Sequence, residues 1–486
     1  MSGPILLTVD LGTTNCKAVA FDADGEPRAA ASVPYPTLNP REGWYEQRTA
    51  DWRAAIESSV RSVTAELGAA AAQTAGLALS AWGPGLVLLD EVGEPLNETS
   101  PTWQDVRSME YGRRLVREAG AGWVGGGMPL TGFPAKLAWA LDAWPEQAGG
   151  AAQAAGVKDY LLGWLTGSLA TEPSSGPYGA EWPEAVFDAL GWDRGRLPPV
   201  VRSTARVGEL RPELARKLGF DAGIPVVAGV NDGAAATLGV GAHLEGDAVV
   251  SLGTNGVFRL VTTTPVGVDV CLDRSLFRYP LVEALWACGG FVLSGGSALE
   301  WLSEAVAGPN GTAIKELVSE AADAPPGSDG VVFLPYLVGR GSPTPDPRAT
   351  GALVGLRPHH RRPHLVRAVL EGVAFGLRDV AEALASLGFG VRRLLVTGGG
   401  AESVAWRGIV ADVLGVPARH SAGDANLGSA IVLAVGLGLE PDLESAARAL
   451  LGPADTIPVT PASAEVYEAA YAAYRDAASR LTAAGR

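Results

Sequence analysis

The sequence predicts an α/β protein made of two domains, and three observations support this prediction. The chain has 486 residues, which exceeds what one hydrophobic core usually organises. A strand–turn–strand pattern at residues 6–22 returns at residues 248–260, which indicates a duplicated unit. Around both copies, short apolar strands alternate with patterns of helical period. We therefore expect one domain at residues 1–241 and a second at residues 242–486.

The composition is that of a globular protein with an acidic balance. Hydrophobic residues make up 47% of the chain and charged residues 19%, so a sizeable core can form. The formal net charge of -15 argues against nucleic acid and against an anionic membrane as standing partners, because both need a positive surface. It does not argue against ATP, since a phosphate site is built locally from backbone N–H groups and a few cations.

The cysteines and the apolar runs of the chain bear on its location. Cys16, Cys271 and Cys288 are widely spaced and form no CxxC pair, so we expect neither a disulfide framework nor a zinc site. The first residues lack the basic segment and long apolar run of a signal peptide. No apolar run reaches the roughly 20 residues that a membrane helix needs. We expect a cytoplasmic protein without membrane contact, and a homodimer is compatible with the sequence.

The first hairpin carries a turn that suits an anion. An apolar strand ends at Asp10, and a second strand follows the turn. Gly12 lets the backbone approach a ligand closely. Phosphate is the common anion at such a turn, and Asp10 offers a carboxylate that can hold Mg2+ through water. The side chains that would donate to a phosphate are Thr13, Thr14, Asn15 and Lys17. An ordinary hairpin without a ligand is the alternative.

The second hairpin repeats the strand, the glycine-containing turn and the strand. Its turn contains Gly253 and Thr254, and Ser251 stands where the first copy has Asp10. Two such turns could hold one nucleoside triphosphate from both sides. Because only the first copy keeps the acid, we expect the metal nearer the first half of the chain.

Asp232 lies in the segment Asn231-Asp232-Gly233, which follows a buried strand expected at residues 226–230 and precedes an alanine-rich helix. One interpretation is that Asp232 is merely the N-cap of that helix. The other is a general base, because a carboxylate at the end of a buried strand and near a helix N-terminus can be directed into a cleft. Asp232 would then lie near the join of the two halves, where ligand sites prefer to form.

Two aromatic stretches are candidates for a substrate site. Trp82 and Gly83 lie in a glycine-rich joint after an apolar strand, which is either a turn or the wall of a ligand pocket. A helix is expected to open within residues 100–108 and to end near residue 119. Trp103 and Asp105, at its start, are either a buried aromatic and a first-turn acid favoured by the helix dipole, or contacts to the face and a hydroxyl of a sugar.

Three consecutive glycines, residues 398–400, follow a strand expected at residues 394–397. They leave room for a flat group such as adenine against the backbone. A flexible turn between strand and helix is the alternative.

Taken in order, these stretches resemble the FGGY family of carbohydrate kinases, within the superfamily of sugar kinases, heat-shock ATPases and actin. The likeness covers nearly the whole chain, from DLGTTNCK through WQDVRS, GVNDGAAATLGVG and SLGTNGVFR to GGGAESVAW and NLGSA. Residues 351–371 resemble the second signature of that family. The resemblance implies two RNase H-like (actin-like ATPase) domains, each with a five-stranded sheet, and a central ligand cleft.

The same resemblance implies an enzyme that uses ATP and Mg2+ to phosphorylate a hydroxyl of a sugar, for example the ketose xylulose. A kinase for a sugar acid or polyol, such as gluconate, glycerol or erythritol, is an alternative. A catalytically inactive sugar-binding member is a further one, and a chaperone-type ATPase is disfavoured by the sugar site that the aromatic stretches predict.

By position, the resemblance also implies roles for the candidate residues. Asp232 would take the proton from the attacking hydroxyl. The residues around ATP and the metal would be Asp10, Asp232, Thr13, Thr14, Asn15, Lys17, Gly253, Thr254, Gly399, Gly400 and Ala401. The residues around the sugar would be Trp82, Gly83, Trp103, Asp105, Asn231 and Asp232.

The chain also departs from the pattern of particular members. Gly83-Pro84 behind Trp82 is more similar to the Trp-Gly of rhamnulokinases than to the Met-His pair of xylulokinases. The Arg-Glu pair typical of glycerol kinases is missing there too. These departures leave the identity of the sugar open and do not affect the implied transfer of a phosphoryl group.

Overall fold

The computed structural model describes residues 3–124, 129–176, 179–220, 223–307, 313–452 and 455–484. The chain divides into two compact units. The first unit comprises Met1–His243, Tyr279–Trp286 and Gly423–Gly452, and the second comprises Leu244–Arg278, Ala287–Ala422 and Pro453–Arg486. The first change of unit lies beside the boundary expected after residue 241. The expected boundary does not account for the two later segments that group with the first unit.

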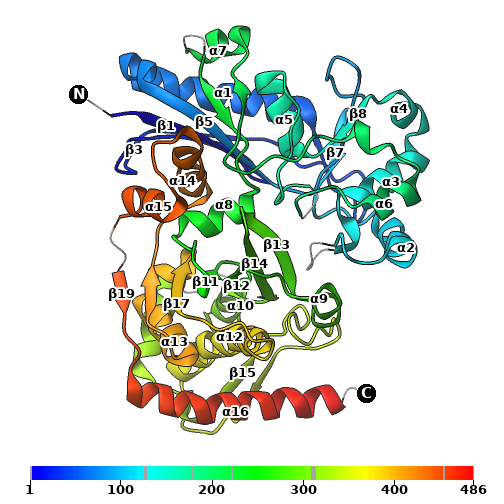
Figure 1. Cartoon of the computed structure of the whole chain (residues 1–486). Coiled ribbons are helices and arrows are strands. Elements are labelled where there is room, and N and C mark those ends of the chain that lie inside the picture. Colours follow the sequence, from blue (N-terminus) through cyan, green and yellow to red (C-terminus); the bar gives the residue numbers. More distant parts are fainter. Residues whose placement is uncertain are drawn as a thin grey trace. The chain divides into compact units, whose positions relative to one another are not determined.

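The first unit is built on a six-stranded sheet (Figure 1). In spatial order its strands are β3 (Pro27–Pro34), β2 (Asn15–Phe21), β1 (Ile5–Leu11), β5 (Thr74–Ala81), β10 (Pro225–Val227) and β9 (Arg206–Glu209). β1, β5 and β10 run parallel, whereas β2 is antiparallel to β1, β3 to β2, and β9 to β10. Two small sheets pair β4 (Glu46–Arg48) with β7 (Thr99–Pro101) and β6 (Val87–Leu89) with β8 (Gln153–Ala155).

Helices cover both faces of this sheet. Successive side chains of a strand point to opposite faces, so both faces carry side chains that need to be buried. Leu7 and Val9 of β1 share a core with Trp52 and Ile56 of α1, and all four side chains are buried. Thr8 points to the opposite face, where its hydroxyl donates a hydrogen bond to Asn426 Oδ1 at 3.0 Å. The helices of this unit are α1 (Thr49–Leu67), α2 (Met109–Ala119), α3 (Phe133–Ala143), α4 (Pro145–Gly150), α5 (Val157–Thr166), α6 (Glu184–Leu190), α7 (Pro212–Leu218), α8 (Asp232–Gly239), α14 (Ala425–Leu437) and α15 (Leu443–Leu450).

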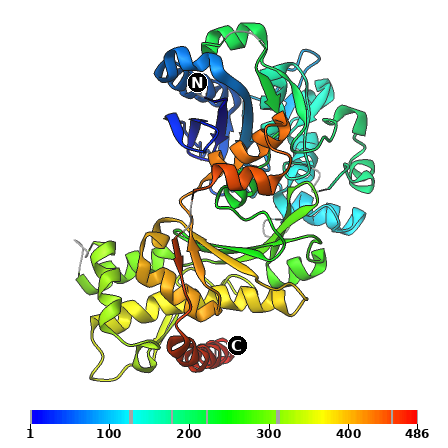
Figure 2. The same ribbon diagram turned by 60° about the vertical axis from the view of Figure 1, so that its left-hand side comes forward.

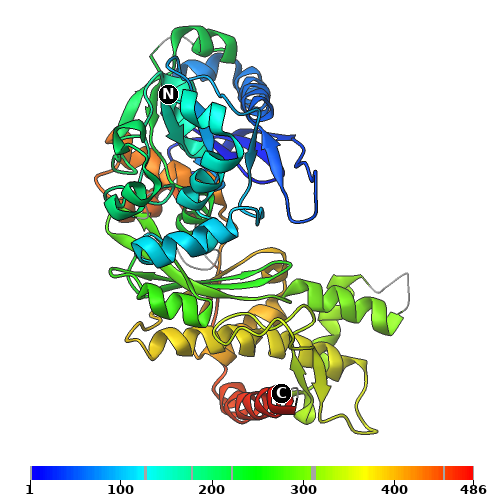
Figure 3. The same ribbon diagram turned by 90° about the vertical axis from the view of Figure 1, so that its right-hand side faces the viewer.

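The second unit contains most of a seven-stranded sheet. Parts of two of its strands, β13 and β14, fall in the segment Tyr279–Trp286, which groups with the first unit. In spatial order the strands are β13 (Phe277–Val282), β14 (Leu285–Val292), β12 (Gly256–Thr262), β11 (Asp247–Leu252), β17 (Arg393–Thr397), β18 (Ala418–His420) and β19 (Asp455–Ile457). A separate hairpin pairs β15 (Val332–Leu334) with β16 (Ala352–Val354). Figure 3 shows the long α12 running along this sheet. The helices are α9 (Val268–Arg274), α10 (Gly296–Ala307), α11 (Ile314–Ser319), α12 (Arg362–Ala385), α13 (Val404–Leu414) and α16 (Pro461–Ala484).

The predicted duplication of the hairpin is confirmed by the strand register. In the first unit, Asp10 of β1 lies opposite Lys17 of β2 and beside Ser80 of the parallel strand β5. In the second unit, Ser251 of β11 occupies the corresponding place, opposite Val257 of β12 and beside Thr397 of the parallel strand β17. Each sheet has more than the five strands expected, because edge strands such as β9 and β19 extend it.

Two boundaries differ from those expected. Residues 99–101 pair with β4 as β7, and the helix expected to open at residues 100–108 begins only at Met109. The strand expected at residues 226–230 ends at Val227, because Gly229 adopts a φ of 71° that a strand residue does not take.

The return of residues 423–452 to the first unit has a physical reason in the contact of α14 with α8 (Figure 2). A Cβ atom on Gly428 would lie 1.8 Å from the carbonyl oxygen of Ala235, and one on Gly239 would lie 1.8 Å from that of Asp424. These glycines therefore let the two helices approach at backbone distance, which no other residue type would allow.

We expect Gly428→Ala to destabilise the protein by about 2 to 3 kcal/mol, because the added methyl group would collide with backbone atoms that cannot turn away. Gly408→Ala is the matched control, since Gly408 also lies inside a helix but has open space around its Cβ position. It should change stability by less than about 1 kcal/mol, in the stabilising direction. Calorimetric unfolding of both variants checks this, and equal stability of the two would contradict the close packing of α8 and α14.

Candidate active site

The turn between β1 and β2 turns its carbonyl groups toward the protein. The Gly12 carbonyl accepts from the Tyr35 hydroxyl, the Thr13 carbonyl accepts from Gln47 Nε2 at 2.7 Å, and the Thr14 carbonyl accepts from the Tyr35 N–H at 3.1 Å. In a trans peptide the N–H points opposite to the C=O. The N–H groups that follow these carbonyls are thus directed away from these partners, as an anion site requires.

Asp10 lies at the end of β1, beside this turn. Its Oδ1 accepts a hydrogen bond of 2.6 Å from the Ser80 hydroxyl. Burial raises the pKa of Asp10 to about 6, and the nearby Asp424 carboxylate adds to the rise, while the Ser80 hydrogen bond and Lys17 oppose it. The ionised form of this buried carboxyl is unfavourable without a nearby positive charge, so its place is well suited to a cation.

Lys17 forms an ion pair of 2.6 Å with Asp424, which is the N-cap of α14. Asp424 was not predicted as a site residue, because it lies in a segment that the sequence places in the second domain. The only signal was its place just before the NLGSA stretch, where it reads as a helix cap. Lys17 therefore lies between two acids of one unit, Asp10 and Asp424.

Asp232 is the first residue of α8, and Asn231 is the N-cap. The Asn231 side chain accepts from the Ala234 N–H at 2.7 Å. The interpretation of Asp232 as a mere N-cap is therefore wrong. Asp232 Oδ1 accepts from the N–H of Gly233 at 2.7 Å, and the residue is partly exposed.

Tyr35 connects the two predicted acids electrostatically. Burial raises the pKa of the Tyr35 hydroxyl, and the negative charges of Asp10 and Asp232 raise it further. Both carboxylates thus lie within electrostatic range of the same hydroxyl group in the first unit. The strand register agrees: Ser80 of β5 lies beside Asp10, and the next residue, Ala81, forms a β-bridge with Asn231, so Asp10, the turn at Gly12 and Asp232 lie in one neighbourhood.

The residues predicted to bind a sugar have unequal surroundings. Trp103 is partly exposed and donates from Nε1 to the Thr13 hydroxyl at 3.0 Å, which places it at the turn between β1 and β2. Gly83 is exposed. Trp82 is only 1% exposed and packs edge-on against Trp52 with ring centroids 5.6 Å apart. Its ring belongs to the core of this structure, and its contact with a sugar stays a prediction.

Asp105 is fully buried, and its carboxylate is used within the protein. It accepts from the Tyr45 N–H at 2.7 Å and from the guanidinium of Arg107 at 2.7 and 2.8 Å. Arg107 in turn lies 3.6 Å from the ring centroid of Trp44. These contacts give Asp105 a structural task, and its contact with a sugar hydroxyl stays a prediction.

The turn between β11 and β12 in the second unit has the same inward carbonyls. The Gly253 carbonyl accepts from the N–H of Gly296 at 2.7 Å, and the Thr254 carbonyl accepts from the N–H of Gly295 at 2.9 Å and from Ser297 Oγ at 3.0 Å. A Cβ on Gly295 would lie 2.5 Å from the carbonyl carbon of Asn255. This support was not predicted from the sequence, although the pair of glycines at residues 295–296 was a usable signal for close backbone approach.

Residues 398–400, the glycine stretch after β17, lie against the C-terminal end of β11. Gly398 has a φ of 90°, and a Cβ there would lie 2.8 Å from the Leu252 carbonyl oxygen. Gly399 is exposed and has nothing within 4 Å of its Cβ position, whereas Ala401 is buried. An exposed backbone without side chains is the surface that a flat ring needs, so Gly399 fits the predicted nucleotide role better than Ala401 does.

The described part of the chain has no group of three or more His, Cys, Asp or Glu arranged to hold a metal ion. Mg2+ needs no such group, because it usually keeps several waters and binds one or two carboxylates together with phosphates. Asp10, beside the inward-carbonyl turn, fits that mode of binding.

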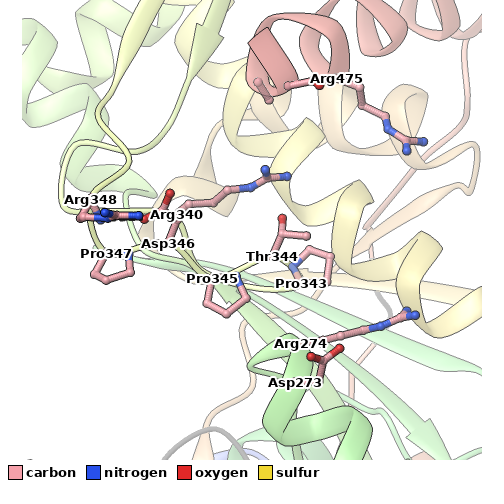
Figure 4. Close-up of a pocket in the computed structure, with 12 residues that line it drawn as sticks. Asp273, Arg274, Arg340, Pro343, Thr344, Pro345, Asp346, Pro347, Arg348 and Arg475 are labelled. Carbon is pink, nitrogen blue, oxygen red and sulfur yellow. Dashed lines mark hydrogen bonds and ion pairs between the residues drawn. The ribbon is translucent and has the colours of Figure 1, made fainter. Parts of the chain in front are cut away.

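A cavity of about 1080 Å3 in the second unit has none of these residues in its lining (Figure 4). The loop at residues 343–348 lines it, together with Arg340 and Arg475. Arg340 pairs with Asp379 at 3.3 Å and Arg475 with Glu382 at 3.7 Å. Arg274 and Arg348 line it as well, and because none of the predicted site residues does, the cavity is not assigned to the active site.

No helix in the described residues is both long enough and apolar enough to cross a membrane.

Family models match most of the chain. The model for the N-terminal domain of the FGGY family of carbohydrate kinases matches residues 5–239, and the model for the C-terminal domain matches residues 248–437. Both matches begin within the strands that lead into the two repeated turns, β1 and β11.

Individual proteins agree with these models. The chain is 31% identical over 464 residues to a "Xylulose kinase" of Lactococcus lactis subsp. lactis (strain IL1403), a match that covers 92% of this chain and 90% of that protein. It is 29% identical over 431 residues to a "Gluconokinase" of Bacillus subtilis (strain 168), covering 84% and 82%. The solved structure of a "xyloylose kinase" from Brucella ovis matches with a TM-score of 0.89 at 29% identity and covers 99% of each chain.

We expect Asp10→Asn to stabilise the ligand-free protein at neutral pH. The pKa of Asp10 is raised from its ordinary value of 3.8 to about 6, so the folded state binds this proton more tightly than the unfolded chain does. Stability therefore falls as the pH rises through this window, and removing the charge relieves a cost of up to about 3 kcal/mol above it. The asparagine oxygen can still accept the Ser80 hydrogen bond.

Melting temperatures at about pH 4.5 and about pH 8 check this expectation. The variant should exceed the unaltered protein clearly at the higher pH and only slightly at the lower pH. A difference of the same size at both pH values would mean that Asp10 titrates normally.

Proposed function

Because the chain belongs to the FGGY family of carbohydrate kinases, we propose that it transfers the γ-phosphoryl group of ATP to a hydroxyl of a ketose, with D-xylulose as the leading candidate. The observation that carries the proposed chemistry is the position of Asp232. It begins α8 while Asn231 serves as the cap, and its partly exposed carboxylate lies at the helix N-terminus, where Oδ1 accepts from the N–H of Gly233. A carboxylate in such a place can serve as a base.

The first unit would bind the phosphates of ATP. The N–H groups of Thr13, Thr14 and Asn15 would donate to phosphate oxygens, and Lys17 would add a positive charge. The inward carbonyls of the turn support this arrangement. Charge-assisted hydrogen bonds of about 1.5 to 3 kcal/mol each are sufficient to hold a phosphate without a basic surface.

The second unit would bind the rest of the nucleotide. We propose that Gly253 and Thr254 bind phosphate through their backbone and that Gly399, Gly400 and Ala401 line the adenosine end. The exposed backbone of Gly399 supports this part of the proposal.

In the proposed reaction the oxygen of the sugar hydroxyl attacks the γ-phosphorus. The bond between that phosphorus and the bridging oxygen of ADP breaks, the electron pair leaves with ADP, and the hydroxyl proton passes to Asp232. A positioned base contributes about 10²- to 10⁴-fold to such a step, and positioning and charge neutralisation supply the remainder.

Asp10 and Asp232 are the residues that we propose to hold Mg2+, mainly through water. When bound, the ion neutralises charge on the phosphates. The raised pKa of Asp10 supports a role beside a cation, because a nearby positive charge would favour its ionised form.

The sugar would bind beside the phosphate turn. Trp103 and Gly83 are accessible and would contact it directly, and Asn231 and Asp232 would contact its reacting hydroxyl. Trp82 and Asp105 are buried in this structure, so we propose that they shape the site from behind.

A sugar acid is the second candidate substrate, and the likeness to the Bacillus subtilis gluconokinase favours D-gluconate within that class. We also propose a cytoplasmic location, which the three free and buried cysteines support, and a homodimer as the assembly to be tested by sedimentation.

Asp232→Asn should lower kcat at least about 10²-fold, because the base is lost while its size is kept. Binding of a fluorescent ATP analogue should persist, because Asp10 and the donors of the first turn remain. Asp269→Asn is the matched control, since Asp269 also lies in the first turn of a short helix but belongs to no proposed site. Full turnover by the Asp232 variant would remove the base assignment.

A coupled assay of ADP release over D-xylulose, D-ribulose, D-gluconate, glycerol and erythritol tests the substrate. We expect D-xylulose to give the highest kcat/KM, because the chain is 31% identical to a xylulose kinase over 464 residues. A higher value for D-gluconate would transfer the assignment to the second candidate. ADP release with none of the five compounds would contradict the proposed substrate classes.

A further inference from the structure

A buried polar network lies behind the segment that ends at Asp232. Its members come from residues 158–203 and all belong to the first unit. Glu172 is 0% exposed and Lys158 is 2% exposed, and the Lys158 ammonium lies 3.3 Å from Glu172 Oε1. Ser174 and Ser203 are equally buried and complete the network.

The Glu172 carboxylate is saturated by donors from the protein. Oε1 accepts from the Ser174 hydroxyl at 2.8 Å and from the Ser175 hydroxyl, and Oε2 accepts from the Ser174 N–H at 2.8 Å and the Ser203 hydroxyl at 3.1 Å. A buried carboxylate is tolerated only with this kind of compensation. Its oxygens therefore hold the loop at residues 172–175 in one conformation.

Ser174 in turn holds Asn231 through two hydrogen bonds. The Ser174 hydroxyl accepts from the Asn231 N–H at 2.8 Å, and the Ser174 carbonyl accepts from Asn231 Nδ2 at 2.6 Å. Asn231 Oδ1 is occupied by the Ala234 N–H. Both ends of the Asn231 amide are thus used, so its orientation is fixed and the start of α8 is fixed with it.

The backbone just before Asn231 is held by two residues of the same network, Lys158 and Ser203. Lys158 Nζ donates to the Ala228 carbonyl at 2.8 Å, and the Gly229 N–H donates to the Ser203 carbonyl at 3.0 Å. A Cβ on Gly229 would lie 2.2 Å from the Leu79 carbonyl oxygen, so the backbone presses against β5 at this point. The whole approach to Asp232 is therefore constrained at successive residues.

We propose that Glu172 is a positioning residue, which acts through Ser174 and Asn231, with Lys158 as its counterion, to place the Asp232 carboxylate for proton transfer. The proposal rests on the proposed role of Asp232 as the base. None of these side chains needs to touch substrate. A displacement of about 1 Å at a reacting group can cost about 10²-fold in rate, so a network this far from the chemistry can still control turnover.

The chain offers a matched pair of variants to test this. Ser174→Ala removes a buried hydroxyl that donates to Glu172 and accepts from Asn231. Ser203→Ala removes a buried hydroxyl that donates to the same carboxylate but makes no hydrogen bond with Asn231 in the described part of the chain. Both should lower the melting temperature, because each takes one donor from a buried carboxylate.

Only Ser174→Ala should lower kcat, by about 10- to 100-fold, with the KM for ATP unchanged. Turnover is measured with ATP and D-xylulose, or with D-gluconate if that is the better substrate. Hydrogen exchange of the backbone at residues 228–233 should also become faster in Ser174→Ala and not in Ser203→Ala. Glu172→Gln should act in the same direction as Ser174→Ala, and if it does not fold, the serine pair still decides.

Equal kcat and equal exchange in the two serine variants would overturn the proposal. Asp232→Asn, measured beside them, separates a failure of the base assignment from a failure of the positioning role. If it keeps full turnover, the base assignment fails. If it is inactive while Ser174→Ala matches Ser203→Ala, only the positioning role fails. The exchange measurement needs no substrate, so it tests the hold on Asn231 even if no sugar is turned over.

Discussion

The contact between α8 and α14 is made at glycine positions, where backbone atoms of the two helices come too close for any side chain. This contact binds a segment near residue 424 to the first unit, although it follows most of the second unit in sequence. It sets Asp424 beside Lys17 and Asn426 beside Thr8. The charges around the first turn depend on this packing, because Asp424 reaches Lys17 only if α14 begins where it does.

The charge balance at that turn then follows from elementary electrostatics. Two acids, Asp10 and Asp424, share one neighbouring cation, Lys17, and burial makes the charge of Asp10 costly. The carbonyls of the turn point into the protein, so its N–H groups are left for an anion. The site is thus prepared for a paired anion and cation, which is the form in which ATP and a divalent ion bind together. Behind Asp232, the Glu172 network provides a rigid support of a different kind, built from buried hydrogen bonds rather than from close backbone contact.

Local patterns in the sequence were sufficient for the repeated hairpins, the position of Asp232 at a helix start and the family. They could not reveal Asp424 or the link from Glu172 through Ser174 to Asn231, because these depend on contacts between residues far apart in the chain. Trp82 shows a second limit: a tryptophan in a glycine-rich joint has the same local pattern whether its ring enters the core or a pocket, and here it packs on Trp52. The helix expected from residue 100 begins later for a similar reason, because residues 99–101 pair with a strand 53 positions earlier.

The central claim is that the first turn, with its carbonyls held inward, is the site of the ATP phosphates. A crystal structure of the protein with Mg2+ and a non-hydrolysable ATP analogue tests this most directly. The account predicts phosphate oxygens within hydrogen-bond distance of the N–H groups of Thr13, Thr14 or Asn15, and the ion on the side of Asp10. Phosphates bound elsewhere, with this turn in contact with solvent alone, would contradict it.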